Sequence, residues 1–197
     1  MVKAMKVILL TTILLLCFSN EAKAKYIFNE TTQYYAINEP EPEALLSTVS
    51  RTLKPACKSK RRVFTCISST TDITYEPLKI GMGICRLSPV NVTESVTYRI
   101  PKWNQAYNVP LDVVKQWKSL IKESIAHAKH HGAIRNKYMK IANKKLLRLE
   151  ARCSRIKKEA KKIIAKSHDK IKRDNKRLDS RQSHYPSSFP SEEQVDK

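Results

Sequence analysis

The chain has 197 residues, with 38 Lys and Arg against 18 Asp and Glu, so its formal net charge is +20. This length fits one ordinary domain plus a targeting segment, and 41% apolar residues fill one core rather than two. The 28% of charged residues argue against a polytopic membrane protein, and with 3 glycines there is no GxGxxG or GxxxxGK(S/T) pattern for nucleotide chemistry.

Residues 1–24 have the pattern of a secretory signal peptide. Lys3 and Lys6 precede an apolar run over residues 7–18, and Ala22 and Ala24 are the small residues that a signal peptidase recognises. The run is too short to span the ~30 Å hydrocarbon core of a bilayer, which argues against a permanent anchor. We therefore expect cleavage after Ala24 and a protein that is exported, either periplasmic or secreted.

Four cysteines follow the signal segment, which in an exported chain favours two disulfides. Cys57 and Cys66 flank a basic stretch, KSKRRVFT, that can close a hairpin. This favours the pairs Cys57–Cys66 and Cys85–Cys153 among the three connectivities, with free thiols as the alternative.

Residues 25–110 carry the pattern of short strands. Clusters of β-branched and aromatic residues, separated by turn residues, lie at Tyr34–Ile37, Val63–Ile67, Ile73–Tyr75 and Val96–Ile100. Glu43–Leu53 fits one short helix among these strands.

Two long helices are expected after Pro110. The first runs from about Leu111 to about His130 and buries one stripe: Val113, Trp117, Leu120, Ile121 and Ser124. The second has a seam of residues three and four apart: Leu146, Leu149, Cys153, Ile156, Ala160 and Ile163. This seam favours packing against the first helix and the sheet, and a homodimeric coiled coil is the alternative.

Together these elements predict one α+β domain over residues 25–181. A small antiparallel sheet from residues 25–110 packs on two long helices from the basic part, residues 111–181. Residues 182–197 are polar and contain two prolines, which predicts a disordered tail.

The histidines are the most informative feature of the chain. His127, His130 and His131 lie within five consecutive residues. On a helix, His127 and His131 project from one face about a turn apart, a spacing that lets two imidazoles bind one zinc ion. The alternative is that clustered histidines on a surface helix are only solvated.

A family resemblance starts at the same helix. The run Trp117–Gly132, WKSLIKESIAHAKHHG, followed by AIRNKYMKI, resembles a bacterial family of unknown function whose members are labelled predicted secreted zinc-dependent proteases. In that family a helix that starts with tryptophan leads into AHExxHG. Cys85 in GICRL, the strand end IPKW at Ile100–Trp103 and Cys153 also fit the family pattern, and so do the residues around Tyr34–Ile37. The resemblance implies a zinc ion and a protein or peptide substrate.

The chain departs from the family at one position. Where HExxH has its glutamate, the general base of a zinc hydrolase, this chain has Ala128. Loss of a positioned general base lowers the rate by ~10²- to 10⁴-fold, and the nearest acidic residue in the helix, Glu123, is four residues before His127. The resemblance thus implies a divergent, catalytically impaired member that keeps His127 and His131 as metal ligands.

A zinc site also needs a third protein ligand. Glu150 follows His131 at a spacing similar to that of zinc peptidases with a helical glutamate ligand. The alternative is that Glu150 is only a solvated helix residue. His168 and His184 are the other candidates. The family tends to keep an aspartate and a histidine near the end of its last helix, and the segment around His184 resembles that feature only loosely.

Charge supports an alternative function. Residues 115–181 contain 23 Lys and Arg against 6 Asp and Glu, so the two helices attract polyanions. In an exported bacterial protein the partner would be an anionic envelope surface, such as acidic lipid, lipopolysaccharide or cell-wall polymer. The sequence contains no specific nucleic-acid motif. The alternative to the zinc protein is therefore a non-enzymatic basic protein that binds polyanions.

Overall fold

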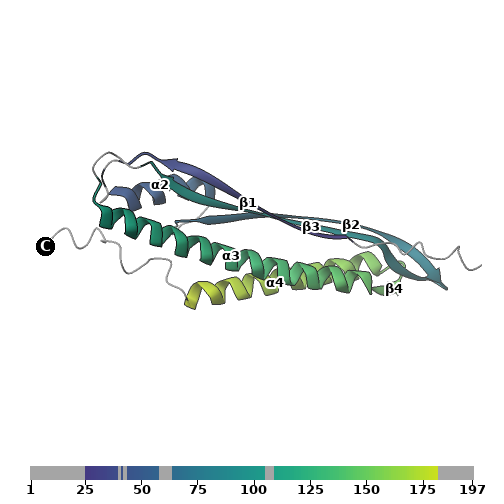
Figure 1. Ribbon diagram of the computed structural model, residues 1–197. Helices are drawn as coiled ribbons and strands as arrows, with labels where there is room; N and C mark the ends of the chain where they lie inside the picture. Colours follow the sequence, from purple (N-terminus) through teal and green to yellow (C-terminus); the bar gives the residue numbers. More distant parts are fainter. Residues whose placement is uncertain (1–24, 40, 42–43, 58–63, 105–108, 182–197) are drawn as a thin grey trace, which may run out of the picture.

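A long sheet lies along a pair of antiparallel helices in the computed structural model, which describes residues 25–39, 41, 44–57, 64–104 and 109–181 (Figure 1). The elements in chain order are β1 (Lys25–Ile37), α2 (Leu45–Cys57), β2 (Cys66–Gly81), β3 (Ile84–Trp103), α3 (Leu111–Leu147), β4 (Glu150–Arg152) and α4 (Ile156–Arg181). The expected α+β architecture, with a sheet from the N-terminal half packed on two long C-terminal helices, is confirmed.

The sheet is mixed rather than antiparallel throughout. β3 is the central strand, with β2 antiparallel to it and β4 antiparallel to its first residues. β1 is parallel to β3, with Lys25 opposite Asn91 and Ile37 opposite Trp103. The antiparallel expectation was wrong for β1, because α2 and β2 separate β1 from its partner in sequence and a parallel crossover needs such a connection.

The strands are also longer than expected. Ile73–Tyr75 lies within β2, and Val96–Ile100 lies within β3. Val63, the expected start of one strand, lies outside the described residues, and the short helix is present as α2.

The core forms where β3 faces the helices. Burial alternates along β3, as expected for a strand with one face covered. The largest core cluster joins Val90 and Val92 of β3 with Met139 and Leu146 of α3 and Ile156 of α4. A second cluster joins α2 to Trp103 and to Trp117 of α3.

The two helices differ from expectation in their boundaries. α3 continues past His130, through Gly132, to Leu147. The single helix expected along the seam from Leu146 to Ile163 is wrong, because residues 150–152 leave the helix to pair with Ile84–Arg86 of β3. Buried Trp117 and Leu120 confirm that the expected stripe of the first helix faces the core.

A disulfide fixes this break in the helices. Cys85 of β3 is bonded to Cys153, which follows β4, as predicted. Cys66 is also disulfide-bonded, and the side chain of its predicted partner, Cys57, lies outside the described residues, so that pairing stays a prediction.

The predicted signal peptide and tail, residues 1–24 and 182–197, lie outside the described residues. Within the part of the chain that the structure describes, no helix is long and apolar enough to cross a membrane.

Candidate metal centre

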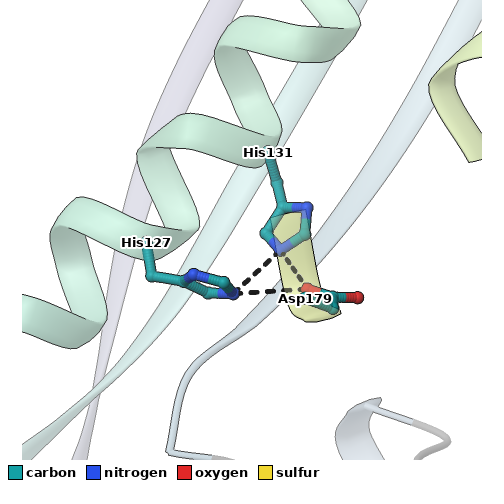
Figure 2. Close-up of side chains that lie close together, drawn as sticks. All are labelled: His127, His131 and Asp179. Atoms are coloured by element: carbon teal, nitrogen blue, oxygen red, sulfur yellow. Dashed lines mark hydrogen bonds and ion pairs between the residues drawn. The ribbon is translucent and has the colours of Figure 1, made fainter. Parts of the chain in front are cut away.

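Two histidines and one aspartate converge between α3 and α4 (Figure 2). His127 and His131 lie one turn apart on α3, and their Nε2 atoms are 3.0 Å apart. α4 runs back along α3 and places Asp179 Oδ1 3.4 Å from His127 Nε2 and 3.0 Å from His131 Nε2. The structure thus supplies three ligand atoms that face a common point.

The three atoms have the spacing that a tetrahedral zinc site requires. Zinc–nitrogen and zinc–oxygen bonds of ~2.0–2.1 Å place neighbouring ligand atoms about 3.3 Å apart. The observed separations of 3.0–3.4 Å match this value. The two histidine side chains are 18% and 15% exposed and that of Asp179 is 39% exposed, although its Oδ1 atom is buried. Two imidazoles and one carboxylate are also a known ligand set of catalytic zinc.

A buried polar atom next to the group supports the same interpretation. Asn175 lies one turn before Asp179 on α4, and its Oδ1 atom is buried without a hydrogen-bond partner in the described part of the chain. A buried acceptor of this kind is rare unless water or an ion meets it. The residues present therefore fit a bound cation.

The group opens into a cleft of about 640 Å³ between α3 and the start of β2. Phe64, Ile67 and Ser69 lie along one side, and Glu123 and His130 line the other side with the metal group. The cleft is large enough to admit part of a substrate next to the three ligand atoms.

The general-base position is occupied by a buried methyl group. Ala128 is 2% exposed and packs in a cluster with Val96, Tyr98 and Ile100 of β3. Glu123 lies a turn before His127, and its Oε1 accepts a hydrogen bond of 3.2 Å from Ser119 Oγ. The described part of the cleft thus has no carboxylate at the place where an HExxH helix has one.

A buried ion pair, one turn after His131, seats α3 on the sheet. Arg135 Nε donates to Glu94 Oε1 at 2.5 Å, and Glu94, which is fully buried, also accepts from Thr71 Oγ1 at 2.5 Å. Because a buried carboxylate without its partner is strongly unfavourable, this ion pair fixes where α3 lies on β3.

Two tyrosines near these contacts have shifted pKa values. Burial first, and the nearby Glu94 carboxylate second, raise the pKa of Tyr26 to about 12, with Arg135 acting in the opposite direction. Burial and a hydrogen bond to Glu30 raise the pKa of Tyr98 well above its usual value. Both hydroxyls therefore stay protonated at neutral pH and act as hydrogen-bond donors.

Gly132 allows the close approach of α3 to Tyr98. A Cβ atom at this position would lie 1.9 Å from Tyr98 Oη, which is far shorter than any real contact. Because Gly132 follows His131 directly, this approach also sets the height of the histidines above the sheet.

The sequence candidates for the third ligand lie in three different places. Glu150 is on β4, opposite Arg86, and the α3 residues between it and His131 span roughly 24 Å. His168 is on α4 and lines a neighbouring cleft that also contains Asp179, but it is not part of the converging group. His184 lies outside the described residues.

Sequence reasoning missed Asp179. The seam from Leu146 to Ile163 predicts one helix and gives no sign of the turn between α3 and α4. Once the chain folds back at residues 148–155, the end of α4 returns to the histidines, and Asp174 and Asp179 are the acidic residues there. The aspartate that the family keeps near the end of its last helix was the other available signal.

The chain matches a bacterial protein family by sequence. The model of DUF922, described as bacterial protein of unknown function, matches residues 32–185, which include both histidines and Asp179. Neither a curated protein nor a solved structure matches the chain.

Proposed function

The chain belongs to the DUF922 family of bacterial proteins of unknown function, and we propose that it is an exported zinc-binding member with impaired peptidase chemistry. The observation that carries this proposal is the convergence of His127, His131 and Asp179 at zinc-ligand spacing. The signal-peptide pattern and the Cys85–Cys153 disulfide support export to an oxidising compartment.

The donor set favours zinc over other common cations. Two imidazoles with one carboxylate suit zinc, whereas calcium and magnesium prefer oxygen ligands. A zinc ion held there would supply Lewis acidity to a group bound in the cleft. His127 and His131 would hold and orient the ion from α3, and Asp179 would close the site from α4.

The impairment follows from Ala128. Its methyl group cannot accept or deliver a proton, and its contacts with Val96 and Ile100 leave it in an apolar environment. We therefore expect the natural chain to bind a peptide in the cleft without cleaving it at a rate comparable to that of an HExxH enzyme.

Zinc content by mass spectrometry of the purified chain, prepared without a histidine tag, tests the metal site. We expect about one zinc per chain in the natural protein and loss of zinc in His127→Ala and Asp179→Ala. His168→Ala and Glu150→Ala are matched controls and should keep the metal. Zinc retained in Asp179→Ala, or lost equally in Glu150→Ala, would contradict the assignment of the third ligand.

A peptidase assay with and without chelator tests the impairment. We expect no chelator-sensitive cleavage of an unstructured protein such as casein by the zinc-loaded chain. Robust cleavage that the chelator abolishes would show that Ala128 is no handicap and would reject this part of the proposal.

The basic helices support a second candidate function, which is non-enzymatic binding of anionic envelope surfaces or other polyanions. On α4, Lys157, Lys158, Lys161 and Lys162 are exposed, and Lys172 and Lys176 are exposed further along the helix. Binding to immobilised heparin that weakens as salt rises is the expected result. Absence of binding at low salt would reject this candidate and leave the zinc proposal untouched.

A further inference from the structure

The end of the β2–β3 hairpin carries a concentration of exposed apolar side chains. Leu78, Ile80, Met82 and Ile84 lie within seven consecutive residues, and Met82 is 102% exposed while the other three are 37–44% exposed. In the described part of the chain, the remaining exposed large apolar side chains are Tyr34 and Leu111, far along the molecule. Clustered exposed apolar residues mark interaction sites more often than isolated ones do.

This hairpin end is held firmly in place. The turn is Met82–Gly83, with Gly83 at φ 75°, and the Cys153 amide donates to Gly83 O at 2.9 Å. The adjacent Cys85 is bonded to Cys153, and β4 pairs with the first residues of β3. Figure 1 shows the hairpin at one end of the elongated molecule, next to β4. The apolar residues are therefore presented by a rigid support and not by a loose loop.

Cationic residues lie on the strands next to the apolar tip. Arg86 lies directly opposite Leu78 on the neighbouring strand, Lys79 lies opposite Cys85, and Arg152 of β4 lies opposite Ile84. Glu150, opposite Arg86, is the acidic residue among these strand neighbours. The strand neighbours of the apolar tip are thus mostly cationic.

We propose that the β2–β3 hairpin end inserts into the headgroup region of an anionic lipid bilayer. The apolar side chains would reach the boundary of the acyl chains, and Lys79, Arg86 and Arg152 would contact lipid phosphates. Binding of this kind grows with buried apolar area and with attraction to anionic headgroups, and the hairpin supplies both. The proposal deepens the second candidate function and rests on it for the charge attraction.

Vesicle flotation with the processed chain tests the proposal. Intact mass must first verify that residues 1–24 have been removed, because the apolar residues 7–18 would bind lipid themselves. Vesicles of phosphatidylcholine with phosphatidylglycerol are compared with vesicles of phosphatidylcholine alone. We expect binding only to the anionic vesicles, weakened by salt. The double variant Ile80→Ser/Met82→Ser should bind at least about tenfold more weakly, since transfer of exposed apolar area drives insertion.

Leu111→Ser is the matched control, because Leu111 is 77% exposed but lies at the start of α3. It should bind vesicles like the natural chain. Met82→Ser alone provides the same test if the double variant does not fold, because the Met82 side chain is fully exposed and its removal opens no cavity.

Insertion has a second readout that adsorption by the basic helices alone would not produce. In Met82→Trp, anionic vesicles should shift the tryptophan emission to shorter wavelength, and in Leu111→Trp they should not. Equal vesicle binding by the natural chain and Met82→Ser, or no emission shift in Met82→Trp, would overturn the proposal. A stable dimer that Met82→Ser dissociates would also overturn the proposal, because the tip would then contact a second copy of the chain. If the insertion proposal is overturned but the natural chain still binds heparin, the second candidate function remains supported.

Discussion

Gly132 is the residue that lets α3 lie close to the sheet. Alanine normally stabilises a helix interior by about 1 kcal/mol relative to glycine. Here the added Cβ would meet Tyr98 Oη at 1.9 Å, so the steric term opposes the helical preference and exceeds it.

We predict that Gly132→Ala lowers the free energy of unfolding by roughly 1–3 kcal/mol, as overpacked sites do. Urea denaturation measures the change. In the Tyr98→Phe background the Oη atom is absent. Gly132→Ala should therefore cost less stability in that background than in the natural chain. Stabilisation by Gly132→Ala would mean that Tyr98 moves aside freely.

Tyr26 ties β1 to α3 and gives stability a dependence on alkaline pH. Its single hydroxyl proton is shared between two acceptors, the backbone oxygen of Asn136 at 3.1 Å and Asn136 Oδ1 at 2.9 Å. Burial first, and Glu94 second, raise its pKa from 10.0 to about 12. Because the folded-state pKa lies above the ordinary value, the contribution of Tyr26 is complete below pH 10 and is lost as pH rises towards 12.

Tyr26→Phe should therefore lower stability by about 1 kcal/mol at pH 7 and flatten the decline of stability above pH 10. Chemical denaturation at a series of pH values measures both effects. Tyr34→Phe, which changes an exposed tyrosine of the same strand, should leave stability at pH 7 unchanged. A decline that is equally steep in Tyr26→Phe would show that other groups cause it.

Among the elements, the Cys85–Cys153 disulfide closes a loop that contains most of β3 and all of α3, with a sequence separation of 68 residues. Loop-closure entropy for this length amounts to about 4 kcal/mol. We predict that Cys85→Ser/Cys153→Ser loses an amount of this order, measured by guanidinium denaturation under oxidising conditions. If the unfolding free energies of the double variant and the natural chain agree within about 0.5 kcal/mol, packing around β4 is sufficient to hold this region without the disulfide.

The sequence predicted the elements better than their connections. Clusters of β-branched and aromatic residues predicted one part of β3, Val96–Ile100, and helical periodicity predicted the first part of α3, because local burial determines both patterns. The break at residues 148–155 carried no comparable signal, since Leu149 and Cys153 continue the helical spacing while their contacts are with distant β3. Only tertiary pairing with Ile84–Arg86 separates α3 from α4.

The candidate site was predicted in part for the same reason. His127 and His131 lie on one helix, so their spacing sufficed to place them together. Asp179 joins them only through the fold of the helical hairpin, and no local pattern in α4 distinguishes it from Asp174 or Asp169. The sequence thus predicted the two ligands on α3 and missed the third ligand, which lies on α4.

For the molecule as a whole, a bound metal would join the two long helices at a point far from the disulfide. Zinc at 100 times its dissociation constant stabilises the folded chain by about 2.7 kcal/mol, which for a chain of this size raises the melting temperature by roughly 5–10 °C. We predict this rise for the natural chain and for His168→Ala, and none for Asp179→Ala, by calorimetry with zinc and with chelator. An equal rise in Asp179→Ala would mean that zinc binds elsewhere.

The parallel pairing of β1 with β3 has a consequence for the order in which the chain folds. Lys25 emerges first, yet its partner Asn91 follows 66 residues later, after α2 and β2. β2 and β3, by contrast, are joined by a two-residue turn and can zip together locally. The loop-closure entropy of the long connection must be overcome before β1 gains any sheet contact. We therefore expect the hairpin to form first and to serve as the template that β1, although synthesised earlier, joins later.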